Sequence, residues 1–184
     1  SKDLSKKYKN FKIINGCFSK IDELIYSNCT IKIKKFDIII FDLGLSSNQI
    51  NDPKRGFSFM KEGPLDMNMG GSKTRVSEVI NNFSERKLAD IFFELGEEKY
   101  AKRIARNIVK HRKIKLINST TKLSELIKES IPKINSKKMK INPATKTFQA
   151  LRIYVNDELN ELKKALSKSS KLLNKEGKLI VVSF

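Results

Sequence analysis

The apolar run from Phe36 to Asp42, with the sequence Phe-Asp-Ile-Ile-Ile-Phe-Asp, constrains the fold of this chain more than any other feature. It is short and rich in β-branched residues, which predicts a strand that is covered on both faces, as in parallel sheets. Two elements are expected before it: a short strand over 11–16 and a helix that begins with Ser19 as its cap and ends near Ser27. This order of strand, helix and strand predicts an open α/β sheet.

The segment after this strand, residues 43–72, is rich in Gly, Ser, Asn, Asp and Pro, which predicts a long loop. Loops of this length are uncommon in compact domains, and ligands bind at the carboxyl ends of strands in open α/β sheets. Hydrophobic periodicity and capping residues then predict helices over 76–82, 85–95, 97–110 and 123–131, with caps at Ser84 and Thr120-Thr121. A long amphipathic helix over 148–173, a break at 174–177 and a strand over 178–184 are expected to follow. We therefore expect a helical insertion over about 70–142 within an α/β domain.

The composition excludes several classes of protein. The chain has 184 residues, of which 39% are hydrophobic, enough for a core, and no apolar run approaches the length of about 20 residues that spans a membrane. Cys17 and Cys29 form no paired motif, so we expect no cysteine zinc site or other metal site and a reducing compartment. The chain begins at Ser1 and stops inside an apolar run, so we expect it to be a fragment of a longer protein.

The charge of the chain predicts a polyanionic partner. There are 38 Lys and Arg residues against 20 Asp and Glu, a net charge of +18, and residues 71–146 hold 19 basic against 8 acidic residues, a net charge of +11. Between Lys99 and Lys115 there is no acidic residue, and helical spacing places six basic residues opposite an apolar face: Lys99, Lys102, Arg103, Arg106, Lys110 and Lys113. This pattern favours a surface that faces nucleic-acid phosphates. The alternatives are a Lys-rich composition bias and an ordinary solvated face.

Three segments carry residues that suit a ligand site. Asp42 ends the buried strand, and the following loop offers the hydroxyls of Ser46 and Ser47 and the amide of Gln49; the alternative is that Asp42 caps a turn. Arg55 is a candidate phosphate contact that Asp66 could instead orient, and the Phe and Met residues over 57–69 either stack a flipped base or form a hydrophobic flap. The helix that begins near Thr145-Lys146-Thr147 offers an anion site or simple capping. No P-loop and no GxGxxG motif is present, so a nucleotide hydrolase is not supported.

The chain resembles the bacterial MraW/RsmH methyltransferase family over essentially its whole length, and five segments in the family's order carry the resemblance: DLGLSSNQ at 42–49, RGFSF at 55–59, GPLDMNM at 63–69, GEEKYAKRIARNIV at 96–109 and NPATKTFQALRIYVNDEL at 142–159. The resemblance implies an α/β, class I (Rossmann-like) methyltransferase open sheet with an inserted all-helical domain. The division that it implies is part of the methyltransferase core with the cofactor and substrate loop over 1–69, a helical RNA platform over 70–142, and a return to the core over 143–184.

The resemblance also implies a reaction and its site residues. The family transfers a methyl group from S-adenosylmethionine to the N4 amino group of a cytidine in 16S ribosomal RNA of the 30S subunit, so a cytoplasmic enzyme without an obligate protein partner is expected. Phe18, Asp42 and Gln49 match positions that contact the cofactor, and the family's Gly-rich cofactor loop would precede Ser1. Asp42, or loop groups such as the hydroxyls of Ser46 and Ser47, would hold an N–H of the attacking amino group.

The expected RNA contacts are basic residues of the loop, of the predicted helical insertion and of the helix that follows it: Arg55, Lys99, Lys102, Arg103, Arg106, Lys110 and Lys146. A fragment of this length would lack half of the cofactor pocket, so we expect it to be inactive alone. The alternative function is a non-catalytic RNA-binding or ribosome-assembly protein that keeps the same fold.

Overall fold

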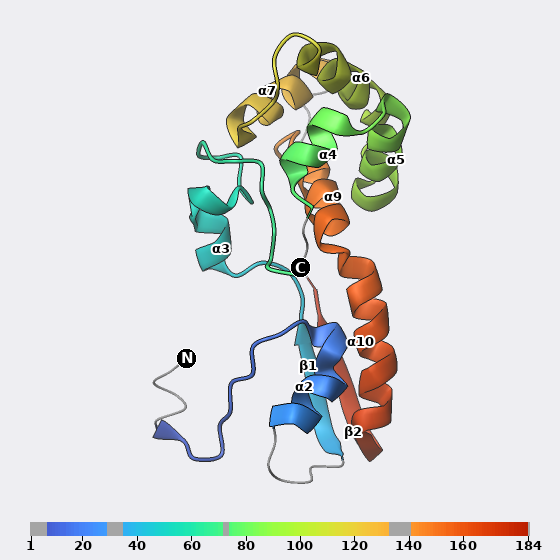
Figure 1. Cartoon of the computed structure of the whole chain (residues 1–184). Helices are drawn as coiled ribbons and strands as arrows, with labels where there is room; N and C mark the ends of the chain where they lie inside the picture. Colours follow the sequence, from blue (N-terminus) through green and yellow to red (C-terminus); the bar gives the residue numbers. More distant parts are fainter. Residues whose placement is uncertain (1–6, 29–34, 72–73, 133–140, 184) are drawn as a thin grey trace. The chain divides into compact units, whose positions relative to one another are not determined.

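The computed structural model describes residues 7–28, 35–71, 74–132 and 141–183. It divides into two compact units, one formed by residues 1–44 and 159–184 and the other by residues 45–158 (Figure 1). The first unit holds the two strands and the second holds most of the helices.

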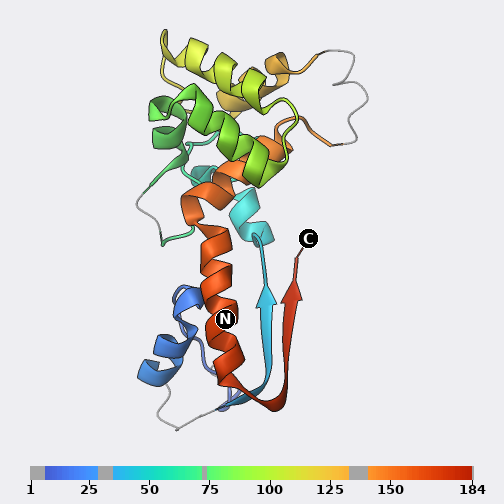
Figure 2. The same cartoon turned by 90° about the vertical axis from the view of Figure 1, so that its right-hand side faces the viewer.

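The sheet of the first unit consists of two parallel strands, β1 (Phe36–Asp42) and β2 (Leu173–Val182), which lie side by side in Figure 2. The bounds of β1 confirm the strand that the apolar run predicts. β2 begins before the expected residue 178, and the expected break at 174–177 is a bulge within it. The pairing shows this, because Phe36 lies opposite Leu173 while Ile38 already lies opposite Lys178.

One face of this strand pair is covered by helices. Ile39 and Phe41 of β1 are buried together with Ala165 and Leu172 of α10 (Glu158–Leu172), and α2 (Ile21–Asn28) packs against the same cluster. The side chains of Ile38 and Ile40, which point to the other face, are exposed. The prediction of a strand buried on both faces is therefore wrong for the part of the chain that the structure describes, where helices cover one face of β1 and no element covers the other.

Two expectations for the start of the chain are also wrong. Residues 11–15 form no strand, because no described strand lies beside them to complete a hydrogen-bonded ladder. Ser19 does not cap a helix: it lies inside a 3-10 turn, η1 (Phe18–Lys20), that leads directly into α2. The Ser19 hydroxyl is almost fully buried and donates a hydrogen bond to Glu161 Oε2 of α10 instead.

The second unit begins with two short elements and continues as a helical bundle. Its elements are α3 (Ser47–Asn51), η2 (Pro53–Arg55), α4 (Val76–Asn82), α5 (Glu85–Gly96), α6 (Ala101–Arg112), α7 (Thr120–Ser130) and α9 (Thr145–Asn156). The segment 43–72 is therefore not wholly loop, since it contains α3 and η2. The bounds of α4 are as predicted, and Ser84 caps α5 as predicted, because its hydroxyl accepts a hydrogen bond from the Lys87 N–H at 3.3 Å.

Two helix starts differ from the prediction for local reasons. α6 starts at Ala101 and not at Glu97, because Glu97 adopts a left-handed conformation with φ of 49° that ends α5. The carboxylate of Glu98 then accepts a hydrogen bond from the Tyr100 N–H at 2.9 Å, directly before α6. α7 starts at Thr120, three residues before the expected helix, because Ser119 supplies its cap.

The long helix expected over 148–173 is two helices, α9 and α10, separated by Asp157. Asp157 has a φ of 51°, in the left-handed region that Asp and Asn tolerate better than most residues. The guanidinium of Arg152 binds both carboxylate oxygens of Glu158, at 2.7 and 3.0 Å, across this break. A helical period continues through the break in the sequence, so hydrophobic spacing alone could not reveal it.

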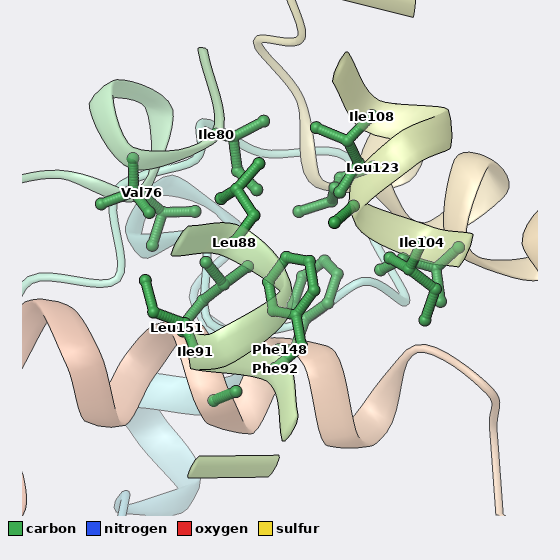
Figure 3. Close-up of a cluster of buried hydrophobic side chains, with 14 of the residues drawn as sticks. Val76, Ile80, Leu88, Ile91, Phe92, Ile104, Ile108, Leu123, Phe148 and Leu151 are labelled. Atoms are coloured by element: carbon green, nitrogen blue, oxygen red, sulfur yellow. The ribbon is translucent and has the colours of Figure 1, made fainter. Parts of the chain in front are cut away.

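The core of the second unit lies between α5 and its neighbours α6 and α9 (Figure 3). Leu88 and Phe92 of α5 are fully buried, as are Ile104 and Ile108 of α6. Three loop residues, Phe57, Leu65 and Met67, join the same cluster. The range 70–142, which the sequence predicts as an insertion, lies inside this unit, and the division into 1–69, 70–142 and 143–184 stays a prediction.

Gly96, the last residue of α5, allows α5 and α9 to approach closely. A Cβ atom at this position would lie 2.6 Å from the Lys146 carbonyl oxygen and 3.0 Å from the Ala150 Cβ atom. Gly to Ala within a helix usually stabilises by up to about 1 kcal/mol. We expect Gly96→Ala to destabilise the protein by about 1–3 kcal/mol instead, because the backbone of α9 must move. Urea unfolding measures this, with Glu94→Ala on the exposed side of α5 as the control; a stabilised Gly96→Ala protein would contradict the packing described here.

No helix among the described residues is long and apolar enough to cross a membrane.

Candidate functional site

An exposed carboxylate and an exposed aromatic ring lie near the carboxyl end of β1 in the first unit. Asp42 is the last residue of the strand, and no described residue donates a hydrogen bond to its carboxylate. The ring of Phe18 packs against the ring of Phe41, the residue before Asp42, with centroids 5.7 Å apart and planes tilted by 54°. The structure therefore brings two of the three predicted cofactor residues to one end of the strand.

Polar contacts to α10 hold the segment that carries Phe18. Ser19 donates to Glu161, and two turns further along α10 the ammonium of Lys168 binds Asp22 Oδ1 at 2.7 Å and Glu23 Oε1 at 3.3 Å. The hydrogen bond from Lys168 lowers the pKa of Asp22, and the same bond raises the pKa of Lys168. The backbone next to the Phe18 ring is thus fixed by a helix that also covers the sheet.

The pKa shifts of this pair predict how stability depends on pH. Because the pKa of Asp22 is lowered, the ion pair with Lys168 stabilises the folded protein above pH 3.8, the usual carboxyl pKa. This stabilisation is lost as the pH falls through the folded-state pKa of Asp22. The raised pKa of Lys168 means that the same contribution is lost as the pH rises through a value above 10.5. We expect Lys168→Met to lower the urea midpoint between about pH 5 and 9 and to have a smaller effect at both extremes. An effect that is the same at pH 2 and pH 7 would contradict this.

The loop residues Ser46 and Gln49 belong to the second unit and bind each other in a capping box at the start of α3. Gln49 Oε1 accepts from the Ser46 backbone N–H at 2.9 Å and from its hydroxyl at 3.2 Å, and Ser46 Oγ accepts from the Gln49 N–H at 3.3 Å. The Ser-x-x-Gln spacing is a known signature of this motif, so the sequence alone could have revealed it. Ser47, the first residue of α3, is exposed.

Arg55 is held by the loop that it belongs to. Its Nη2 atom donates to the Asn68 carbonyl oxygen at 2.9 Å, and its guanidinium carbon lies 5.3 Å from the centroid of the Phe57 ring. The alternative in which Asp66 orients Arg55 is wrong, because the carboxylate of Asp66 faces Arg75 instead: Asp66 Oδ1 lies 4.0 Å from Arg75 Nε.

The aromatic and Met side chains of this loop mostly pack inward. Phe57 and Met67 are buried in the core, and the Phe59 ring meets the Phe148 ring edge to face at 5.1 Å, whereas Met60 is exposed. This geometry favours the hydrophobic flap over the base-stacking role for the buried side chains.

The basic face predicted on α6 is exposed, and the apolar face opposite is buried. Ala101, Ile104, Ala105 and Ile108 lie in the core, while the predicted basic residues point to solvent: Lys99, Lys102, Arg103, Arg106, Lys110 and Lys113. One of them has an acidic neighbour from another helix, since Arg106 Nε lies 3.5 Å from Glu85 Oε1 of α5. This exposed pair is weak, so the face as a whole stays strongly positive.

Lys146 is half-buried and Thr147 is buried, so the two side chains do not form an open anion site. The ammonium of Lys146 donates to the Glu97 carbonyl oxygen at 3.1 Å, at the end of α5, and Thr147 is fully buried. The side chain of Asn142 accepts from the Ala144 N–H at 3.0 Å, directly before α9. The N-cap residue of α9 is Ala144, and no side chain caps this helix start, so the capping alternative is not confirmed for these residues. The role of Lys146 in RNA binding stays a prediction.

Asn156 is a residue whose role the sequence did not reveal. Its side-chain amide donates to the Met67 carbonyl oxygen and accepts from the Met69 N–H, both at 2.8 Å. It thereby ties the loop that carries Asp66 and Asn68 to the end of α9. The bonded residues are separated by 87 and 89 positions in the sequence, and no local pattern predicts such contacts.

Among the described residues, no three His, Cys, Asp or Glu side chains are grouped closely enough to hold a metal ion.

The strand pair and the helical unit define a protein of mixed α/β structure, with an exposed carboxylate at the end of a parallel strand and a basic helical face. The chain belongs to the MraW methylase family, whose family model matches residues 1–184.

Similar proteins include three that are named ribosomal RNA small subunit methyltransferase H. Those of Rickettsia canadensis and Rickettsia conorii are 51% and 50% identical to this chain over 154 residues, which are 84% of the chain and 49% of each relative. That of Rickettsia bellii is 48% identical over 164 residues, 88% of the chain and 53% of the relative. The chain thus spans about half the length of these curated relatives.

Proposed function

We propose that this chain is part of an S-adenosylmethionine-dependent enzyme that methylates the N4 amino group of a cytidine in 16S ribosomal RNA of the small subunit. The observation that carries the proposal is the identity of about 50% to proteins named ribosomal RNA small subunit methyltransferase H over more than four fifths of the chain. The exposed carboxylate of Asp42 at the end of a parallel strand supports it, because ligands bind at this edge of open α/β sheets.

The residues of the first unit fit the methyl donor chemically. The Phe18 ring offers an apolar surface to a flat base, and the Asp42 carboxylate, which accepts no hydrogen bond from a described residue, suits hydroxyl or amino donors. Gln49 is the third proposed contact; its amide oxygen already serves the α3 cap, which leaves its NH₂ group to donate. The cofactor would supply a methyl group on a positively charged sulfur. A class I methyltransferase sheet is the fold that we propose for the complete protein.

The proposed reaction is a direct displacement in which positioning supplies most of the acceleration. The cytidine N4 nitrogen attacks the methyl carbon, the bond from carbon to sulfur breaks, and its electron pair stays on sulfur. The lone pair of this nitrogen is delocalised into the ring, so an acceptor must hold one of its N–H groups and then receive the proton. Asp42 is our candidate for this acceptor as well as for the cofactor contact; the hydroxyl of Ser47 and the backbone carbonyls of the 43–47 loop are the alternatives. Ser46 is a weaker candidate, because its hydroxyl is engaged with Gln49.

Methyl transfer tests this function in the protein expressed from its complete gene. We expect tritium to pass from S-adenosylmethionine to small ribosomal subunits, and nucleoside mass spectrometry to find N4-methylcytidine in the 16S RNA. Binding of the subunit without methyl transfer would favour a non-catalytic assembly protein instead. Methylation of another nucleoside would overturn the proposed specificity and keep the class of enzyme.

The basic face of α6 is the proposed RNA contact of the second unit. We expect Arg103→Glu with Arg106→Glu to weaken binding to the small subunit and to flatten its dependence on salt, since each lost phosphate contact lowers the slope of log K against log salt by about 0.7–0.9. The matched control reverses two exposed lysines of α10, Lys163→Glu with Lys171→Glu, which changes the net charge equally. If the slope of log K against log salt is the same in the two variants, the α6 face is an ordinary solvated surface.

A further inference from the structure

The loop after α6 exposes two aliphatic side chains among lysines. Ile114 is 84% exposed and Leu116 is 59% exposed, while the next residue, Ile117, is fully buried. Lys113 and Lys115 alternate with them and are exposed as well. A single exposed aliphatic residue is ordinary on a protein surface. Two such residues within the four positions 113–116, at the end of a basic helix, form a surface that is both apolar and positively charged.

This loop is fixed at both ends by hydrogen bonds. At its start, the N–H groups of Ile114 and Lys115 donate to the His111 carbonyl oxygen at 3.0 and 3.1 Å. At its end, the side chain of Asn81 in α4 binds both backbone groups of Ile117, accepting from the N–H at 3.0 Å and donating to the carbonyl at 2.9 Å. The entropy of ordering this backbone is therefore lost on folding, and a partner that contacts Ile114 and Leu116 does not lose it again.

The charge around the loop selects the class of partner. There is no acidic residue from Lys99 to Lys115, and the loop continues the exposed basic face of α6 through Lys110 and Lys113. A polyanion therefore fits this surface better than a neutral or basic protein does. The apolar face of α6 is buried in the core, so the helix has no free apolar face that could insert into a lipid surface.

We propose that Ile114 and Leu116 form a non-ionic contact to the RNA substrate, in which they pack against ribose and base surfaces while Lys113 and Lys115 hold phosphates. Phosphate contacts position a protein on nucleic acid, whereas apolar contacts reach the sugars and bases between the phosphates. The proposal rests on the proposed function, because it names a second kind of contact for the same RNA-binding unit.

The test compares an apolar variant with a charge variant of the protein expressed from its complete gene. We expect Ile114→Ser with Leu116→Ser to weaken binding to small ribosomal subunits by about tenfold at every potassium chloride concentration, with an unchanged slope of log K against log salt. Lys113→Ala with Lys115→Ala is the matched control from the same loop and should give a shallower slope. All four side chains are exposed, so thermal unfolding of both variants should match the wild-type protein.

Each other outcome overturns the proposal. Unchanged affinity in the serine variant would remove the apolar contact, and a slope that falls as in the lysine variant would mean that the effect is ionic. A loss of binding to intact subunits but not to protein-free 16S RNA would assign the loop to a ribosomal protein. A loss of binding only to vesicles of anionic phospholipid would assign it to a membrane. A wild-type protein that binds no ribosomal RNA refutes the proposed function, whereas wild-type binding with an indifferent serine variant refutes this inference alone.

Discussion

Asp42→Ala should lower kcat/KM for methyl transfer by about a hundredfold or more in the protein expressed from its complete gene. The substitution removes the exposed carboxylate at the end of β1, and losing one such group from a catalytic or cofactor site typically costs a factor of 10²–10³. The measurement is tritium transfer from S-adenosylmethionine to small subunits at varied concentrations of both.

A matched control comes from the same strand. Asp37 lies near the opposite end of β1, where its carboxylate accepts a hydrogen bond from the side chain of Asn174 at 2.5 Å. We expect Asp37→Ala to keep methyl transfer within about threefold of the wild-type rate, since a surface group away from the site contributes little. If Asp42→Ala lost methyl transfer and kept full affinity for the cofactor, the assignment of Asp42 to the cofactor would be wrong and its role would lie with the amino group alone.

Phe92→Ala should lower the free energy of unfolding by about 3–5 kcal/mol, the usual range for removing a fully buried aromatic side chain. Phe92 has an exposed fraction of 0% at the centre of the second unit, among side chains of α5, α6 and α9 (Figure 3). The next residue provides the control, because Phe93 is 65% exposed on the same helix.

The comparison of the two variants isolates the contribution of buried packing to the free energy of unfolding. We expect Phe93→Ala to change the free energy of unfolding by no more than about 0.5 kcal/mol, as surface substitutions usually do. Urea unfolding followed by far-ultraviolet circular dichroism measures both. Equal losses at the two positions would mean that α5 does not pack on α9 through the face described here.

Sequence patterns predicted the elements that local chemistry controls. The apolar run gave the bounds of β1, Ser84 gave the cap of α5, and the spacing of Ile104 and Ile108 gave the buried face of α6. These features depend on residues within a few positions of one another, which is the range over which propensity and periodicity act.

The features that the sequence did not predict depend on partners far along the chain. The local sequence predicts a helix cap at Ser19, but its hydroxyl donates to Glu161. It likewise predicts an anion contact for Lys146, but its ammonium donates to the Glu97 carbonyl oxygen. The break at Asp157 leaves the hydrophobic period intact, so only the backbone reveals it. Such polar contacts are set by tertiary packing, which competes with the local roles that the same side chains could serve.

In the candidate site too, the sequence predicts some features and misses contacts made by the same side chains. Asp42 ends β1, and the Phe18 ring packs on Phe41, the residue before it, so both predicted cofactor residues are near the carboxyl end of this strand. The sequence predicts a phosphate contact for Arg55, but its guanidinium donates to the Asn68 carbonyl oxygen within its own loop. The sequence thus predicts candidate groups, and it could not show which of them the fold already engages in hydrogen bonds.

The central claim is that methyl transfer depends on the carboxylate of Asp42 and that RNA binding depends on the basic face of α6. Its most direct test measures two quantities for two variants: the single-turnover rate of methyl transfer at saturating small subunits, and the Kd for those subunits. We expect Asp42→Ala to lose the rate and keep the Kd, and Arg103→Glu with Arg106→Glu to raise the Kd and keep the rate at saturation. A charge-reversed protein that binds normally, or an Asp42→Ala protein that loses only subunit binding, would contradict the account.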